Sequence, residues 1–249
     1  MRILLYLILI PFLSFSQLNY KIQYDVQLNS FQKKGFLFFN KYSAPHYYEF
    51  TPTNPKKVNM SEKDDGNAEL RITVENKFEE TRRQLYNLKN DTIINVDYIE
   101  DEIVTYFDAP KKLNWELINE TKNISGYTCS KATTNFRGRK YTAWFTTDIP
   151  FRFGPWKFTN SPGLIMEIAD ESGKFSWYVT KVEVAREPTE FVLDKKSKIV
   201  TLKEFVAKND KNGEELATQM QLKLAPRGTV IEKVTIMRGR EKTFEWEEE

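Results

Sequence analysis

Apolar and polar side chains alternate along much of this chain, and this period of two constrains the fold more than any other feature. In the clearest run, every second residue from Tyr20 to Leu28 is apolar, and Lys, Gln, Asp and Gln lie between them. Successive side chains of a strand point to opposite faces of its sheet, so this run predicts a strand with one buried and one wet face. Further rows of this kind begin at Leu70, Ile94, Leu113, Tyr141 and Leu164.

The stretch from 175 to 184 changes this period inside one predicted strand. The apolar residues Phe175, Trp177 and Val179 occupy odd positions, whereas Val182 and Val184 occupy even ones. In a regular strand these two groups would lie on opposite faces. An extra residue swaps the faces of the side chains that follow it, so a β-bulge or sharp bend would explain the change. A strand that is covered on both faces would explain it equally well. Bulges are common where a sheet curls toward a barrel or bowl.

Helical signal is confined to the region after residue 200. Thr201 and Glu204 have the spacing of a capping box, in which a hydroxyl caps the first turn and a glutamate reaches back to it. Leu202, Phe205 and Val206 then fall on one face of the predicted helix. Residues 209–213 read as a stop, residues 214–224 as a second and weaker helix, and residues 230–237 as a return to strand.

The order of these elements predicts the fold class. Strands do not alternate with helices, which argues against a parallel α/β sheet, and no Pro/Ser-rich linker divides the chain. We therefore expect a mainly β fold, an antiparallel sheet curled into an open barrel or bowl, with one or two short helices near the C-terminus. The chain is expected to form a single domain.

The first residues have the composition of an export signal. Arg2 precedes an apolar run over residues 3–15, which is shorter than the roughly 20 residues that span a bilayer. Ser14 and Ser16 are small residues at the −3 and −1 positions of a cleavage site. We expect residues 1–16 to be a signal peptide and residues 17–249 to form one β-rich domain. The mature protein is expected to be periplasmic or secreted, without a membrane span.

The residue counts exclude several classes of protein. With 37 Lys and Arg against 35 Asp and Glu, the net charge is +2, whereas a general nucleic-acid binder needs a basic surplus. Cys129 is the one cysteine and His46 the one histidine, so neither an internal disulfide nor a zinc cage rich in Cys and His can form. Cys129 lies in a strand-like stretch, where a buried and inert thiol is expected. No cofactor is expected.

Recognisable catalytic motifs are missing from the chain. It has neither a phosphate-binding glycine loop nor a G-x-S-x-G elbow, and a catalytic triad would have to recruit His46. We therefore predict no catalytic and no metal-binding residue, and favour a non-catalytic binding or accessory module. Two alternatives stay open. One is a hydrolase that uses a pair of the many carboxylates, and the other is a carrier whose aromatic rows line a cavity for a hydrophobic molecule.

Aromatic and basic residues are densest between 126 and 178. Aromatic faces beside arginine donors suit sugars or peptides, through stacking and forked hydrogen bonds. Trp156 and Phe158 lie on a connection between two Gly/Pro pairs, where exposure and function are expected. The alternative is that such rings fill the core of the sheet. The candidate binding residues are Arg137, Arg139, Trp144, Trp156 and Phe158.

The tripeptide Arg-Gly-Arg occurs twice in the chain. It occupies positions 137–139 and 238–240, and each copy is followed three residues later by threonine. The two copies mark equivalent hairpins or arise by chance, since their flanks differ and no fixed period recurs.

A series of short blocks in the dense region resembles the GLPGLI family of exported proteins from Bacteroidetes. The blocks are Gly-Tyr-Thr-Cys-Ser-Lys-Ala at 126–132, Phe-Arg-Gly-Arg-Lys-Tyr-Thr-Ala-Trp-Phe-Thr at 136–146 and Asp-Ile-Pro at 148–150. They continue with the family-motif positions Gly154, Pro155, Pro162, Gly163, Leu164 and Ile165. The family's hexapeptide begins Gly-Leu, whereas this chain has Asn160-Ser161 before Pro162. The Pro-Gly turn and the apolar pair survive this departure, so the fold is expected to survive as well.

The resemblance implies a location and a role, but no reaction. It implies a protein of the periplasm or cell surface with an unknown protein or glycan partner at the cell envelope. The family is similar to the bowl-like β domain that precedes the catalytic part of some exported peptide N-glycosidases, which favours an accessory role. The resemblance also gives a meaning to Asp-Thr-Ile at 91–93. This triplet resembles a site of O-glycan attachment in Bacteroidetes, with Thr92 as the modified residue; the alternative is a turn between strands.

Overall fold

A computed structural model describes residues 19–29, 31–40, 46–51, 82–87, 91–100, 102–109, 112–185, 196–224 and 238–247. The predicted signal peptide, the predicted strand that begins at Leu70 and the predicted strand at 230–237 lie outside the described residues.

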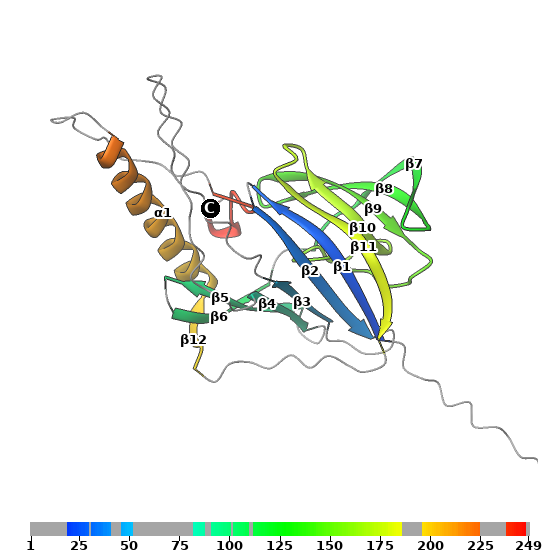
Figure 1. Cartoon of the computed structure of the whole chain (residues 1–249), viewed down its shortest axis with the longest axis horizontal. Coiled ribbons are helices and arrows are strands. Elements are labelled where there is room, and N and C mark those ends of the chain that lie inside the picture. The colour runs from blue at the N-terminus through cyan, green and yellow to red at the C-terminus, as the bar shows by residue number, and fades with distance from the viewer. Residues whose placement is uncertain are drawn as a thin grey trace, which may run out of the picture.

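The described strands form one sheet of twelve strands in the order β12-β6-β5-β4-β3-β2-β1-β11-β10-β9-β8-β7. They are β1 (Asn19–Leu28), β2 (Phe31–Asn40), β3 (His46–Thr51), β4 (Arg82–Asn87), β5 (Thr92–Ile99), β6 (Glu102–Asp108), β7 (Glu116–Ile124), β8 (Tyr127–Phe136), β9 (Arg139–Thr146), β10 (Leu164–Asp170), β11 (Phe175–Ala185) and β12 (Lys198–Thr201). Two meanders, β1–β6 and β7–β11, join where β11 pairs with β1. Neighbouring strands run antiparallel except β12, which pairs with β6 in parallel. Figure 1 shows the broad part that contains β1, β2 and β7–β11, with β3–β6 and β12 to one side of it.

This sheet confirms the mainly β fold predicted from the alternating pattern. It stays open, because β7 and β12 lie at the two ends of the strand order, and it is not strongly curled. The register of β11 against β1 shifts between Gln23 and Tyr24, which pair with Lys181 and Val179 and leave Thr180 as the extra residue. The parity change in the stretch from 175 to 184 is therefore a β-bulge.

A single long helix, α1 (Leu202–Leu224), follows β12. Thr201 and Glu204 form the predicted capping box, with the Glu204 amide donating to Thr201 Oγ1 (3.1 Å) and the Thr201 amide to Glu204 Oε2 (2.8 Å). The predicted stop at 209–213 is wrong, because α1 continues through it. Asn and Gly lower helix stability only slightly, and Asn209 donates its side-chain amide to the carbonyl of Phe205, one turn back (3.0 Å).

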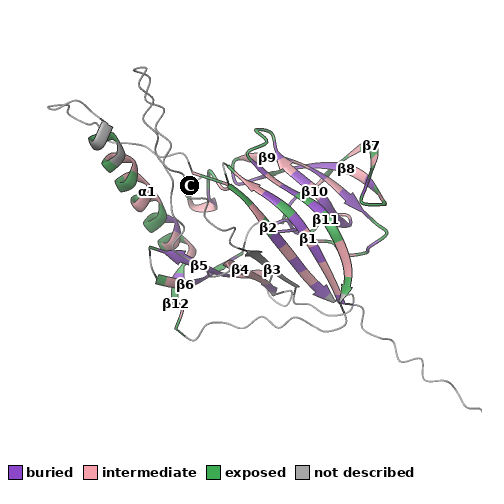
Figure 2. Ribbon diagram, viewed as in Figure 1, coloured by how far each residue is buried: buried purple, intermediate pink, exposed green. Residues whose placement is uncertain are grey.

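Two clusters of buried side chains hold the fold together, and Figure 2 shows the buried residues along both parts of the sheet. The larger cluster joins β1, β2 and β8–β11. The smaller one packs α1 onto the sheet, with the Phe205 ring stacked on Tyr106 of β6 at 4.1 Å between ring centroids. We call the sheet face that carries Leu37 and Tyr106 the inner face.

Residues 147–163, the plug loop, cover the inner face of the larger part. Trp156 and Phe158 of this loop are buried at 4% and 0% exposure. The Trp156 ring is stacked on Trp177 of β11, with centroids 5.7 Å apart, and Phe158 packs edge-on against Tyr141 of β9 at 4.9 Å. The backbone of Trp156 is left-handed (φ 57°), a conformation that a bulky residue adopts only where the surroundings hold it.

The glycines of the family motif allow this loop to close on the sheet. A Cβ on Gly163 would lie 2.1 Å from the backbone oxygen of Thr146, and a Cβ on Gly154 would lie 2.7 Å from Ile165 Cδ1. Leu164 and Ile165 are both fully buried. The motif residues Gly154, Gly163, Leu164 and Ile165 are therefore packing positions in this fold.

Candidate functional site

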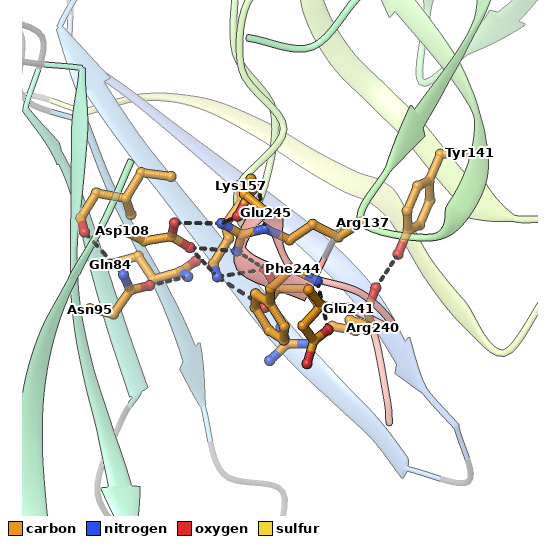
Figure 3. Close-up of polar contacts among 12 residues, drawn as sticks. Gln84, Asn95, Asp108, Arg137, Tyr141, Lys157, Arg240, Glu241, Phe244 and Glu245 are labelled. Carbon is orange, nitrogen blue, oxygen red and sulfur yellow. Dashed lines mark hydrogen bonds and ion pairs between the residues drawn. The ribbon is translucent and has the colours of Figure 1, made fainter. Parts of the chain in front are cut away.

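A cluster of five charged side chains, three of them buried, lies between β6, the β8–β9 turn, the plug loop and the C-terminal residues 238–247, which we call the strap. These residues form the ion cluster: Asp108, Arg137, Lys157, Glu241 and Glu245 (Figure 3). Arg137 donates both terminal nitrogens to Asp108 at 2.8 and 2.9 Å. The Lys157 ammonium lies 2.5 Å from Asp108 and 2.9 Å from Glu241.

Neighbouring charges keep Asp108 and Arg137 ionised in the ion cluster despite their burial. Burial alone would raise the pKa of the Asp108 carboxyl, but Lys157 and Arg137 beside it hold that pKa below its ordinary value. Burial would likewise lower the pKa of Arg137, but its bonds to Asp108 and the charge of Glu241 raise it. Asp108 therefore stays ionised and cannot serve as a general acid near neutral pH.

The strap is bound to the β8–β9 hairpin through both copies of the repeated tripeptide. Arg137 and Gly138 form the turn of this hairpin with positive φ values of 43° and 78°. The Arg139 guanidinium donates to the carbonyl of Gly239 (2.7 Å) and to Asp170 (2.9 Å). The Tyr141 hydroxyl donates to the carbonyl of Arg240 (3.1 Å). The two Arg-Gly-Arg segments thus lie against each other, and they are not equivalent hairpins.

A cleft of about 340 Å³ opens beside the ion cluster, and we call it the strap cleft. It lies between strands β4–β6, the first half of α1 and the strap. Four arginines line it, Arg82, Arg83, Arg238 and Arg240, together with the carboxylates Asp97, Asp210 and Glu241. Its aromatic lining comes from Tyr98, Tyr106, Trp156, Phe205 and Phe244. Its volume is at the low end of the roughly 300–1,000 Å³ found for small-molecule sites.

The floor of the strap cleft is polar because of the register of the sheet. Gln84 pairs with Asn95, and Asn95 pairs with Tyr106, so these three side chains form a row on the inner face. Gln84 Nε2 donates to Asn95 Oδ1 at 2.7 Å (Figure 3). Asn95 in turn donates to the carbonyl of Ile93 at 3.0 Å. The Gln84 Oε1 atom is buried and accepts no hydrogen bond from the residues that the structure describes. A buried acceptor without a donor costs free energy, which a hydroxyl donor would recover.

The carboxylates of the strap cleft are held in ion pairs. Asp97 lies 2.8 Å from Arg82, Asp210 lies 2.6 Å from Arg238, and Glu241 belongs to the ion cluster. A paired-carboxylate hydrolase needs two carboxyl groups that are free to flank its substrate. Each of these three carboxylates is instead bound by a basic side chain.

The predicted binding residues come together only in part. Arg137, Trp156 and Phe158 all contact the ring of Phe136, and Trp156 lines the strap cleft. Trp144 alternates with the buried Ala143 and Phe145, so it lies on the opposite face of the sheet, with the Lys122 ammonium 4.4 Å from its ring centroid. The expected exposure of Trp156 and Phe158 is wrong, because the plug loop turns both rings into the core. Ligand binding by these residues stays a prediction.

Several residues that line the strap cleft were not predicted from the sequence. Arg82 and Gln84 come from β4, a short strand of six residues with weak alternation, and Arg240 comes from the strap. Their spacing in the chain carries no local signal, because only the folded sheet brings them together. The repeated Arg-Gly-Arg segments were the one available sign, since one copy contacts the strap and the other is part of it.

Two further predicted positions lie away from the strap cleft. Thr92 begins β5 and is partly buried, and its modification stays a prediction. Cys129 is fully buried, as predicted, and burial raises the pKa of its thiol to about 11. In the described ranges, neither a group of three potential metal ligands nor a helix long and apolar enough to cross a membrane is found.

A family model accounts for most of the β-rich region. Residues 59–208 match the family described as N-glycanase peptide, N-terminal domain, which is more than half of the chain. The chain belongs to this family. The match on the N-glycanase N-terminal domain neither supports nor opposes the resemblance to the GLPGLI family, which stays a prediction. Among curated proteins there is no match.

A solved structure with a similar fold agrees with this family. The chain matches PNGF-II in its P21 crystal form with a TM-score of 0.53 at 17% identity, over 77% of this chain and 33% of that chain. At this identity the likeness to PNGF-II shows the fold, and this chain spans about a third of the PNGF-II length. An uncharacterized conserved protein from Thermus thermophilus also matches, with a TM-score of 0.40 at 10% identity, over 75% of this chain and 91% of that chain.

Proposed function

We propose that this protein is an exported, non-catalytic accessory module that binds a glycan in the strap cleft. The observation that carries the proposal is the polar cleft itself, where amide and guanidinium groups line the floor beside aromatic rings. Sugars are recognised by such planar polar groups, which match pairs of hydroxyls, and by aromatic faces. The description of the family as an N-glycanase N-terminal domain supports a glycan as the ligand class.

The two alternatives from the sequence have less support. A carboxylate hydrolase would need a free acid in the strap cleft, whereas Asp97, Asp210 and Glu241 are in ion pairs. A carrier of a hydrophobic molecule would need an apolar cavity over the inner face of the sheet. Trp156 and Phe158 fill the space over that face in the larger part of the sheet.

A blocking substitution tests the strap cleft. Asn209 lines the cleft and its side chain is exposed on α1, so Asn209→Trp places a bulky ring in the opening without a change to the core. Lys208→Trp is the matched control, because its neighbouring position is equally exposed but does not line the cleft. Wild-type protein is titrated calorimetrically with an N-glycosylated peptide and with the released glycan. We expect saturable binding that Asn209→Trp weakens at least about tenfold and Lys208→Trp leaves unchanged.

Two results would contradict the proposal. If neither probe binds, the ligand is not a glycan of this kind. If Asn209→Trp binds as tightly as wild type, the strap cleft is not the binding site. Thermal melts of both variants show that a loss of binding does not come from unfolding.

Export is a separate part of the proposal and has its own test. The apolar N-terminal run and the resemblance to GLPGLI proteins support it, and the same resemblance supports O-glycosylation of Thr92. Mass spectrometry of the native protein is expected to find Gln17 as the first residue and a glycan on Thr92. An intact N-terminus would reject cleavage after residue 16, and an unmodified Thr92 would reject the modification.

A further inference from the structure

The hydrogen bonds on the floor of the strap cleft fix the orientation of the Gln84 amide. Asn95 donates to the backbone carbonyl of Ile93, which can only accept, so the nitrogen of the Asn95 amide faces Ile93 and its oxygen faces Gln84. Gln84 must then turn its Nε2 group toward that oxygen, because the reverse orientation would set two oxygens against each other (Figure 3). The end of the Gln84 amide that stays open is therefore an acceptor.

This acceptor is buried and unpaired. The Oε1 atom of Gln84 accepts no hydrogen bond from any residue in the described part of the chain, although Gln84 lines the strap cleft. Most buried polar atoms of proteins are paired, and leaving one unpaired costs free energy. A ligand in the cleft that offers a donor to this atom would recover that cost.

The Tyr106 hydroxyl is the second polar group that the floor leaves open. Tyr106 lines the cleft, and within the described ranges no hydrogen bond of its hydroxyl is found. Its ring is held by the stack on Phe205 of α1. Burial, followed by the charge of Asp97, raises the pKa of Tyr106 well above its ordinary value, so the hydroxyl keeps its proton and can donate at neutral pH.

Strand register places these two groups on either side of Asn95. Gln84, Asn95 and Tyr106 form one row across β4, β5 and β6. Two interstrand spacings separate the backbones of Gln84 and Tyr106, which is about 10 Å. Asn95 between them is 1% exposed. A ligand that lies over Asn95 therefore meets an acceptor at one end and a hydroxyl at the other.

We infer that Gln84 is a specificity-determining residue of the strap cleft, which accepts a hydrogen bond from an uncharged donor of the ligand, while the Tyr106 hydroxyl binds a polar atom beside that donor. The inference rests on the proposed function and names the groups of the glycan that the cleft selects. The donor is the N–H of an acetamido group, whose C=O then faces Tyr106, or one of two adjacent sugar hydroxyls. A site built to accept a hydrogen bond rejects ligands without the donor, because its own buried group is then left unpaired.

Gln84→Met tests this inference, because it removes the acceptor and preserves the length of the side chain. Gln23→Met is the matched control. Gln23 is also partly exposed, but it alternates with the buried Ile22 and Tyr24 and does not line the cleft. In calorimetric titration with the N-glycosylated peptide, we expect Gln84→Met to bind at least about tenfold more weakly than wild type and Gln23→Met to bind equally well.

Thermal melts and a second variant separate recognition from folding. The melting temperature of Gln84→Met should stay close to that of wild type, because removal of the unpaired acceptor offsets the lost bond to Asn95. Tyr106→Phe removes only the hydroxyl and keeps the stack on Phe205, and it should weaken binding about fivefold.

Two fragments of the N-glycan identify the donor. Diacetylchitobiose carries acetamido groups, whereas mannotriose carries hydroxyls alone. A loss of affinity in Gln84→Met for diacetylchitobiose only assigns the acetamido N–H, and a loss for mannotriose assigns a hydroxyl.

The inference and the proposed function fail in different ways. Wild-type affinity in a folded Gln84→Met protein, with binding still blocked by Asn209→Trp, would overturn the inference and leave the proposed function standing. An equal loss in Gln84→Met and Gln23→Met would also overturn it. If Gln84→Met does not fold, wild-type affinity in Tyr106→Phe overturns it instead. Absence of binding by the wild-type protein would overturn both.

Discussion

At the scale of single residues, the ion cluster is the feature with the largest energetic consequence. Asp108 and Lys157 have side chains that are each 1% exposed, and Arg137 is 3% exposed, so their charges are removed from water. A buried charge is tolerated only where partners satisfy it, and loss of one partner leaves the others uncompensated. The cluster thereby joins the strap, the plug loop and β6, and it fixes one wall of the strap cleft.

Replacement of Asp108 by Asn should destabilise the protein by roughly 3 kcal/mol at neutral pH. The pKa of Asp108 lies below its ordinary value in the folded state, so its stabilising effect is complete above the unfolded pKa. That effect is lost as the pH falls below about 4 and through the folded pKa. Urea unfolding at a series of pH values measures the difference between variant and wild type, which should shrink in acid.

Asp25→Asn provides the control for this measurement. Asp25 forms an ion pair with Lys34 on the surface, and exposed pairs contribute about 1 kcal/mol or less. A loss in Asp108→Asn that is no larger than in Asp25→Asn, or that is constant across pH, would contradict the role given to the cluster.

At the scale of elements, local patterns predicted the strands with clear alternation, but not the remaining strands or the end of the helix. The period-two rows at β1, β5, β9 and β10 and the bulge in β11 were readable because alternation is a local property. Asn209 and Gly213 looked like a helix stop, but neither residue disrupts the hydrogen bonds of α1 as proline would. The plug loop was misread as an exposed connection, since its burial depends on the distant strand β11, which supplies Trp177.

Gly163→Ala tests the seating of the plug loop. Its Cβ would lie 2.1 Å from the carbonyl oxygen of Thr146, so the loop or β9 must move. We expect a loss of about 3 kcal/mol, at the upper end for overpacked sites. Gly239→Ala is the control, because its Cβ would find Phe175 only at 4.0 Å. Thermal unfolding of the two variants decides the point, and equal melting temperatures would contradict the proposed packing.

At the scale of the whole molecule, the plug loop and the strap pack against the open sheet, and the strap forms one wall of the strap cleft. Fold class and the capped helix followed from the sequence, and so did the crowding of aromatic residues between 126 and 178. The strap cleft did not, because Arg82, Gln84 and Arg240 are far apart in the chain from the other residues that line it, and only strand register and the return of the strap bring them together.

Trp156→Ala should destabilise the whole domain by roughly 3–5 kcal/mol, as expected for removal of a buried aromatic side chain. The ring is 4% exposed and packs against Trp177 and Phe158. Trp144→Ala, on the opposite face of the sheet, should cost much less. Denaturant unfolding of the two variants compares them, and a Trp156→Ala protein as stable as wild type would show that the plug loop is not part of the core.

The central claim is that the strap cleft binds a glycan without cleaving it. Calorimetric titration of the wild-type protein with an N-glycopeptide, followed by mass spectrometry of the recovered glycopeptide, tests this claim most directly. The predicted result is saturable binding at one site per chain and a glycopeptide of unchanged mass. Absence of binding, or release of the glycan from the peptide, would contradict it.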